Sequence, residues 1–259
     1  MKISIIMVVK NGMPFMADAI KSFQLQDYKK KELIIVYGKS SDDTEIFLKR
    51  IKKKYKIFKE KKNNRYDAIN YGIKKSTGNI VGLLHSDDIF FYKNTLSKIF
   101  NFVKKHNCDA VYGGVYFSDR FNLKNIKRIW VSNESNQSIL KNPFKIPHTT
   151  LFLKKKIFKE IGFYKTKYKI ASDYEFIMRL ISNKNLDIRS TNLIHIIMRL
   201  GGDSTNLRFS LKKLIEDFTI AKKYRLNATN ILQKKIYKLS QIFKKKIIKN
   251  KYLNEFNKI

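Results

Sequence analysis

Two adjacent aspartates, Asp87 and Asp88, are the first candidates for catalysis or metal binding. Acidic residues are few in this chain, which has 21 of them against 55 lysines and arginines. They follow residues 80–84, an apolar run that predicts a buried strand. Adjacent carboxylates repel each other unless a cation or hydrogen-bond donors neutralise them. Because Mg²⁺ and Mn²⁺ bind one or two carboxylates together with phosphate oxygens, the pair suits a metal that bridges a diphosphate. An aspartate that caps the next helix is the plainer alternative.

Strands alternate with helices along the first 117 residues. Apolar runs predict strands at residues 3–9, 33–37, 57–59, 80–84 and 110–117. Apolar residues at helical spacing predict helices at residues 15–25, 44–55, 66–75 and 95–106. This order predicts an α/β fold whose mostly parallel sheet carries helices on both faces. Ligands of such sheets bind beyond the carboxyl ends of the strands, so the polar clusters after Val9, Tyr37 and Leu84 should share one edge.

The second half of the chain has a weaker pattern. Residues 119–147 show no clear period and predict a variable segment over the site. Beyond it, we expect strands at residues 149–153 and 193–200 and helices at residues 156–161 and 174–181. From Ser210 the pattern is helical to the end. We therefore expect one domain over residues 1–207, with halves at 1–117 and 118–207, and a helical tail over residues 208–259.

The composition limits the class of protein. A chain of 259 residues that is 43% hydrophobic can bury a sizeable core, and its formal net charge of +34 attracts phosphates of nucleotides, nucleic acids or anionic lipids. Its one cysteine, Cys108, cannot form an internal disulfide and is expected in the core. The apolar start at residues 3–9 is too short for a signal peptide, and no stretch reaches the roughly 18 apolar residues of a membrane span. These features predict a cytoplasmic protein, either free or peripheral on the inner face of the membrane.

Several short motifs follow one another in a fixed order. They are SIIMVVKN at residues 4–11, GKSSDDT at 38–44, YDAINYG at 66–72, LLHSDD at 83–88, HTTLF at 148–152 and SDYE at 172–175. Together, over about residues 3–205, they resemble the family-2 glycosyltransferases, which have the GT-A fold. The likeness is greatest to the bacterial branch that makes surface polysaccharides such as O-antigen, capsule and lipopolysaccharide.

The resemblance implies roles for individual residues. Asp87 aligns with the last aspartate of the family's DXD motif, which implies that it binds Mn²⁺ or Mg²⁺, a Lewis acid for the leaving diphosphate. Asp173 takes the place of the general base, which deprotonates the acceptor hydroxyl in an inverting displacement. The first half would bind a nucleotide-sugar, foremost a UDP-sugar, with GDP and dTDP as alternatives, and the second half the acceptor. The candidate contacts to the nucleotide-sugar are Val9, Asn11, Tyr37, Ser40, Asp67, Asn70, Ser86, Asp88, His148 and Gly202.

Ordinary structural roles remain open for several of these residues. Asn11 and Ser40 also suit turns and caps, and His148 also suits a buried structural histidine. Two positions depart from the family pattern. Tyr37 stands where an aspartate commonly reads uracil, and its ring could stack on a base instead. His85 stands at the first position of the DXD motif, where aspartate is common.

The C-terminal tail is more basic than the rest of the chain, since residues 212–259 hold 14 lysines and arginines against 3 acids. Five apolar residues recur on one helical face of it, namely Leu232, Ile236, Leu239, Phe243 and Ile247. A basic amphipathic helix can lie in an anionic membrane surface, where a lipid-linked acceptor would be found. The alternative is that the stripe packs on the domain, and failure to bind anionic vesicles at low salt would favour it.

Three function classes compete on this evidence. The first is an inverting glycosyltransferase of the hexosyltransferase type, which moves a sugar from a nucleotide diphosphate to a saccharide; our hypothesis is that this saccharide is linked to a lipid. The second is a basic nucleic-acid-binding protein, but the chain has no zinc, helix-turn-helix or base-stacking motif, so no specific nucleic acid is expected. The third is a sugar nucleotidyltransferase, which would require a glycine-rich phosphate loop where residues 11–14 read Asn-Gly-Met-Pro.

Overall fold

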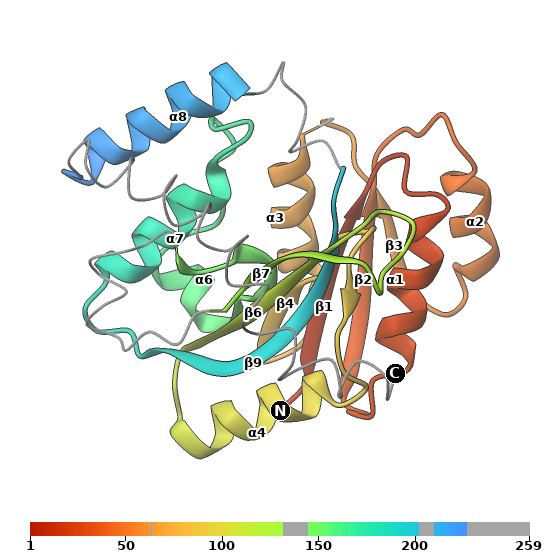
Figure 1. Ribbon diagram of the computed structural model, residues 1–259, viewed down its shortest axis with the longest axis horizontal. Coiled ribbons are helices and arrows are strands. Elements are labelled where there is room, and N and C mark those ends of the chain that lie inside the picture. The colour runs from red at the N-terminus through yellow and green to blue at the C-terminus, as the bar shows by residue number, and fades with distance from the viewer. Residues whose placement is uncertain (63, 132–144, 202–209, 227–259) are drawn as a thin grey trace.

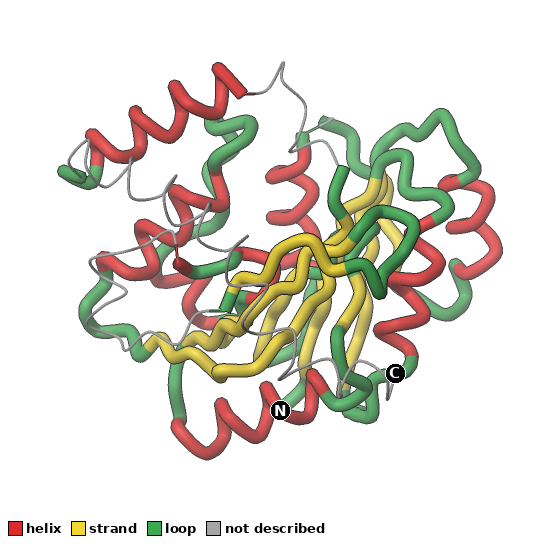
Figure 2. Tube along the Cα trace, in the orientation of Figure 1, coloured by secondary structure: helices red, strands yellow, loops and turns green. Residues whose placement is uncertain are grey.

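The computed structural model describes residues 1–62, 64–131, 145–201 and 210–226. One nine-stranded sheet lies at the centre of this part of the chain, and helices cover both of its faces (Figures 1 and 2). Its strands are ordered β3-β2-β1-β4-β8-β6-β9-β5, and β7 pairs with β6 beside this path. The expected α/β architecture is therefore present.

The first part of the sheet is parallel, as the alternation of strands and helices predicts. β1 pairs in parallel with β2 and β4, and β2 pairs in parallel with β3. The elements of this half are β1 (Ile3–Val9), α1 (Phe15–Gln24), β2 (Lys31–Tyr37), α2 (Thr44–Ile51), β3 (Lys56–Lys59), α3 (Arg65–Lys75) and β4 (Ile80–Leu83).

The second part of the sheet is mixed. β8 lies antiparallel between β4 and β6, β9 is parallel to β6, and β5 and β7 form antiparallel pairs with β9 and β6. The expectation of a mostly parallel sheet thus holds for only half of it. The elements are β5 (Ile89–Phe90), α4 (Thr95–His106), β6 (Ala110–Ser118), β7 (Ile126–Trp130), η2 (His148–Thr150), β8 (Phe152–Lys154), α6 (Lys156–Glu160), α7 (Ser172–Ser182), β9 (Ile188–Arg199) and α8 (Ser210–Lys223).

The two faces of the sheet carry separate hydrophobic cores. Because side chains alternate along a strand, Ile5 and Met7 of β1 pack with α1 and α4, whereas Ile6 between them packs with α3 and α7. Gly72 lets α3 approach the sheet closely, since a Cβ added there would lie 2.5 Å from the Ile6 side chain. Cys108 is buried in the core with α1 and α4, as expected.

Several elements differ from the prediction. The expected strand at residues 149–153 is a 3-10 turn, η2, followed by β8, because the Thr150 hydroxyl bonds the backbone of Gly113 and Pro147. The short strands β5 and β7 were not predicted, since two to five residues carry little periodic signal. β9 begins at Ile188 and not at residue 193, because its pairing with β6 overrides a polar start.

The first helix of the predicted tail packs on the domain. The Glu216 carboxylate of α8 accepts hydrogen bonds from the backbone N–H groups of Lys169, Ile170 and Ala171, at 2.8 to 2.9 Å, and so caps the segment that leads into α7. Ile220 of the same helix is fully buried. The apolar stripe at residues 232–247 lies outside the described residues. Among those described, no helix has the length and apolar character needed to cross a bilayer.

Candidate active site

Most strands of the described sheet end at the same edge. β1, β2, β4, β6 and β9 run in one direction, because β8 is antiparallel to both β4 and β6, and β9 is parallel to β6. At or just beyond their carboxyl ends lie Asn11, Ser40, Asp87, Arg120 and Arg199. The polar clusters expected after the first, second and fourth strands therefore do share one edge.

The loops after β1 and β2 are bonded to each other. The Asn11 N–H donates to Ser40 Oγ (3.0 Å), and Asn11 Oδ1 accepts from the Ser41 N–H (2.8 Å). Asp42 Oδ2 accepts from the Met13 N–H (2.9 Å). Asn11 has φ of 52°, a left-handed conformation that asparagine tolerates better than most residues. Two of the predicted nucleotide contacts, Asn11 and Ser40, thus lie together and fix the shape of this loop pair.

Other predicted contacts border the same loops. Val9 and Tyr37 are register partners at the ends of β1 and β2, with Val9 buried and Tyr37 half-buried. Ser86 lies against the first loop, because a Cβ added at Gly12 would be 3.6 Å from Ser86 Cβ. Gly202 lies outside the described residues.

The two predicted contacts on α3 have different surroundings. The Asp67 carboxylate is partly exposed and lies 3.3 Å from Lys62 Nζ. The Asn70 amide bonds the backbone of Tyr164 in both directions, donating to its carbonyl (2.8 Å) and accepting from its N–H (3.0 Å). Asn70 therefore holds α3 to the segment before α7, whereas Asp67 keeps acceptor atoms open to solvent.

The acidic pair occupies the turn between β4 and β5. The Asp87 carboxylate is 28% exposed and lies 3.7 Å from Arg120 Nη1. Asp88 is fully buried, and neither of its carboxylate oxygens has a hydrogen-bond partner within normal geometry among the described residues. Burial, and after it the Asp87 charge, raise the pKa of Asp88 well above its usual value, against a smaller opposing effect of Arg199. Asp88 does not cap the following helix, since α4 begins only at Thr95.

These two carboxylates fit a divalent cation that is shared with a ligand. The described residues contain no group of three or more histidine, cysteine, aspartate or glutamate side chains that could hold a metal by themselves. Mg²⁺ and Mn²⁺ do not require such a group when phosphate oxygens complete their coordination. The accessible carboxylate of Asp87 supplies the hard donors that these ions prefer, and the buried Asp88 lies behind it.

A chain of polar side chains connects this turn with Asp173. His85 Nε2 lies 3.3 Å from His148 Nε2, and His148 Nδ1 lies 3.2 Å from Asp173 Oδ2. On the other side, the Tyr66 hydroxyl lies 3.3 Å from Asp173 Oδ1 and donates to the Ile170 carbonyl (2.6 Å). His148 is thus a direct partner of the predicted base, although the two residues are 25 positions apart in the sequence.

The charges in this chain favour an ionised Asp173 beside neutral histidines. Burial raises the pKa of Asp173, but His148, Arg65 and Lys213 outweigh it and leave the pKa below the usual value. Burial lowers the pKa of His85 to about 3 and also lowers that of His148. Asp173 lies in the first turn of α7, where the helix dipole also favours a negative charge.

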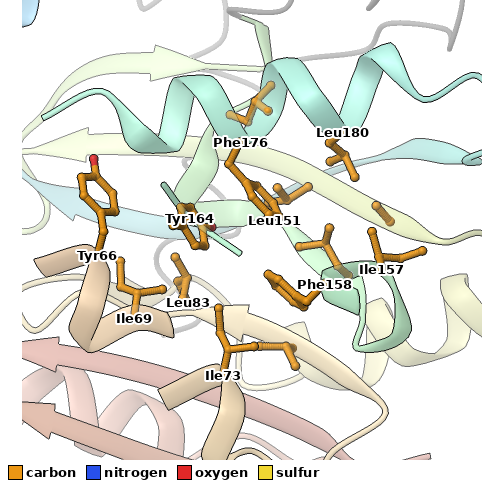
Figure 3. Packing of buried hydrophobic residues seen from close by; sticks show 14 of the residues in the cluster. Tyr66, Ile69, Ile73, Leu83, Leu151, Ile157, Phe158, Tyr164, Phe176 and Leu180 are labelled. Atoms are coloured by element: carbon orange, nitrogen blue, oxygen red, sulfur yellow. The ribbon is translucent and has the colours of Figure 1, made fainter. Parts of the chain in front are cut away.

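Asp173 and the two histidines face a small pocket over the hydrophobic core. In Figure 3, Tyr66 and Ile69 of α3 face Tyr164 and Phe176, and the Tyr66 hydroxyl points away from the core. The rings of Tyr164 and Phe176 stack at 4.4 Å. The pocket is lined by Arg65, Tyr66, Ile69, Leu83, His85, His148, Tyr164 and Asp173.

Sequence reasoning did not identify Arg120, Arg199 and Tyr66 as residues of this edge. Arg199 Nη2 donates to Asp18 Oδ2 (2.5 Å), and Arg199 Nη1 donates to the Arg120 carbonyl (3.1 Å). The two arginines had a usable signal, since each lies at or just after the end of a strand. His195, in contrast, is a buried core residue that bonds to Thr191 (2.7 Å).

Replacing Asp88 by asparagine should stabilise the folded protein at neutral pH by about 1–3 kcal/mol, because the amide fills the same buried site without a charge to bury beside Asp87. The folded-state pKa of Asp88 is raised, so wild-type stability falls as pH increases from the unfolded pKa of 3.8 towards the folded value. The advantage of Asp88→Asn should therefore vanish near pH 3.5. Urea unfolding of both proteins at pH 3.5 and pH 7.5 measures this difference in the free energy of unfolding. If the difference were the same at both pH values, the pKa of Asp88 would not be raised in the folded protein.

Curated relatives of the chain are glycosyltransferases. The chain is 27% identical over 202 residues to a PGL/p-HBAD biosynthesis glycosyltransferase of Mycobacterium tuberculosis, covering 75% of this chain and 74% of the relative. It is 30% identical over 189 residues to an uncharacterised glycosyltransferase of Rickettsia typhi, covering 69% of this chain and 58% of the relative.

Solved structures share the fold at low identity. S. aureus TarS 1–349 in complex with UDP-GlcNAc has a TM-score of 0.61 and 19% identity over 80% of this chain. The mannosyltransferase PcManGT from Pyrobaculum calidifontis, in complex with GDP-Man and Mn²⁺, has a TM-score of 0.63 and 15% identity over 86% of this chain. The chain spans only 61% and 64% of these two solved chains and 37% of a longer TarS chain. The likeness confirms the GT-A fold expected from the sequence.

A family model gives the assignment of the chain itself. The model described as glycosyl transferase family 2 matches residues 4–162, which include the loops after β1 and β2, α3, the acidic pair and His148. This match extends over more than half of the 259 residues. The chain therefore belongs to glycosyl transferase family 2.

Proposed function

We propose that this protein transfers a sugar, with inversion, from a nucleotide diphosphate to a hydroxyl group of a saccharide acceptor. One observation carries the proposal: the His85–His148 contact of 3.3 Å joins the turn that holds the acidic pair to the pocket that holds Asp173. A carboxylate pair suited to a metal and a diphosphate is thus connected, through two histidines, with a carboxylate suited to a base. An inverting transfer needs these two functions on either side of the anomeric carbon.

The donor would bind over the loops after β1 and β2. Asn11 and Ser40 set the shape of this site, Val9 and Tyr37 border it, and Asp67 offers acceptor atoms. UDP-GlcNAc and GDP-Man are bound by the structural neighbours named above, which supports a nucleotide-sugar as the donor class. We propose a UDP-sugar first, with Tyr37 stacked on the base.

The chemistry requires one proton transfer and one displacement. Asp173, ionised at neutral pH, accepts the proton of the acceptor hydroxyl while that oxygen forms a bond to the anomeric carbon. The bond between the anomeric carbon and the phosphate oxygen breaks, and its electron pair leaves with the nucleotide diphosphate. His148 keeps Asp173 oriented through its contact at 3.2 Å.

A divalent cation would be held by Asp87, with Asp88 beside it. When bound, it would supply positive charge to the leaving diphosphate. The Mn²⁺ in the complex of the Pyrobaculum neighbour supports Mn²⁺ or Mg²⁺ as the ion. Asp87 keeps an accessible carboxylate for this purpose, whereas Asp88 is buried behind it.

For the acceptor, we propose a lipid-linked saccharide in the synthesis of a surface polysaccharide. The mycobacterial relative named for PGL/p-HBAD biosynthesis supports a role in cell-envelope glycans. The pocket around Asp173 would bind the acceptor hydroxyl, and its tyrosines, Tyr66 and Tyr164, would line the sugar ring.

A thermal-shift panel tests the donor class. UDP-, GDP- and dTDP-sugars are added with Mn²⁺ or Mg²⁺, and a ligand at 100 times its Kd should stabilise the native protein by about 2.7 kcal/mol. We expect the UDP-sugars to raise the Tm in the presence of metal, and AMP, as a control, to leave it unchanged. If no nucleotide-sugar shifts the Tm at millimolar concentration, the proposed function is wrong.

A further inference from the structure

We propose that Arg120 is a ligand of the donor diphosphate, and that without donor it forms an ion pair with Asp87. This inference rests on the proposed function and adds a residue to it. Arg120 lies two residues beyond the end of β6, at the sheet edge that also holds the acidic pair. The fork of a guanidinium group matches the oxygens of a phosphate better than any other side chain does.

The position of Arg120 places its charge next to the proposed phosphate site. Its Nη1 lies 3.7 Å from Asp87 Oδ2, and the same nitrogen has no hydrogen-bond partner among the described residues. Its Cδ is 3.5 Å from the point where a Cβ at Gly201 would lie, so Arg120 also borders Gly201, two residues beyond the end of β9. The guanidinium group would therefore lie next to a diphosphate that is bound to a metal on Asp87.

Arg120 is held in place by its own set of contacts. Its guanidinium group lies 4.4 Å from the centre of the Phe15 ring, in a cation–π contact. Its backbone carbonyl accepts a hydrogen bond from the buried Arg199, which in turn donates to Asp18. Arg120 and Arg199 thus lie close together next to the proposed phosphate site. Their like charges repel each other, so this arrangement requires anions nearby.

The pair with Asp87 is weak enough to exchange. Both side chains are partly exposed, 33% for Arg120 and 28% for Asp87, and an ion pair so exposed contributes about 0–1 kcal/mol. Charge-assisted, bidentate bonds to phosphate are stronger. When a donor arrives with its metal, Asp87 gains the metal and Arg120 gains phosphate oxygens, so neither charge loses a partner.

The test compares nucleotide and nucleoside binding in Arg120→Met, Arg120→Lys and wild type by titration calorimetry with Mg²⁺. Loss of charge-assisted bonds should weaken UDP binding about 10- to 100-fold in Arg120→Met. Uridine affinity should stay unchanged, because uridine has no phosphate. Arg120→Lys keeps the charge but lacks the guanidinium fork, so its affinity for UDP should lie between those of wild type and Arg120→Met. The matched control is Lys124→Met, which removes an exposed charge from the same loop and should leave UDP binding unchanged.

Binding of Mn²⁺ alone provides a second measurement. Arg120→Met should bind Mn²⁺ more tightly than wild type does, because the guanidinium group that competes with the metal for Asp87 is removed. Equal UDP affinity in Arg120→Met and wild type would overturn the proposal, and so would an equal loss for UDP and uridine. If Arg120→Met bound Mn²⁺ with the affinity of wild type, the proposed exchange of Asp87 from Arg120 to the metal would be wrong. If wild type bound no nucleoside diphosphate at all, whichever base it carried, the proposed function itself would fail.

Discussion

Asp173→Asn should lower the rate of sugar transfer by about 10²- to 10⁴-fold, the usual contribution of a general base. Asparagine has nearly the same shape but cannot accept the proton of the acceptor hydroxyl. Because His148 and Tyr66 bond the carboxylate from two sides, the amide should keep its place in the pocket. The measurement is the initial rate of transfer with a saturating nucleotide-sugar and metal.

Donor binding and pH dependence separate this effect from damage to the fold. Asp173→Asn should bind the nucleotide diphosphate as wild type does. Wild-type activity should fall only at acid pH, below the usual pKa of aspartate, because the pKa of Asp173 is lowered. The variant should lose this acid limb. Asp27→Asn is the control, since Asp27 bonds Ser97 at the opposite edge of the sheet. A variant that transferred sugar at the wild-type rate would place the base elsewhere.

Asp87→Ala should reduce metal-stimulated transfer by at least about 100-fold, because a cation on a leaving diphosphate contributes several kcal/mol to the transition state. The fold should survive, since Asp87 is partly exposed and its ion pair with Arg120 is long. The measurement is the transfer rate as a function of Mn²⁺ and Mg²⁺ concentration, with unfolding curves as the check on stability.

The same variant distinguishes a metal ligand from a residue that binds the donor directly. If Asp87 holds the metal, Asp87→Ala should need a far higher metal concentration, and Asp27→Ala, at the opposite edge, should behave as wild type. Activity that responds to metal as in wild type would refute the assignment. A variant that lost activity together with cooperative unfolding would show instead that Asp87 stabilises the turn before β5.

Local sequence determined the elements of the first half. β1 at Ile3–Val9 and α4 at Thr95–His106 agree with the prediction residue for residue, because apolar spacing is a property of neighbouring residues. The edge that carries the acidic pair also followed from sequence, since parallel strands joined by helices must end on one side. The family assignment, confirmed by the comparisons, came from the order of short motifs.

Tertiary structure decided what the polar residues contact. The strand β8 lies between β4 and β6 although it follows both in the sequence, and only this insertion aligns the ends of β6 and β9 with those of β1 and β4. The contacts of His85 with His148, of His148 with Asp173, and of Arg120 with Asp87 join residues 25 to 63 positions apart. No periodicity encodes such contacts, because they depend on how whole elements pack. The sequence by itself therefore determined that the acidic pair and the polar loops after β1 and β2 lie at one edge of the sheet, and the packing of the second half added Arg120 and Arg199 and decided which groups meet.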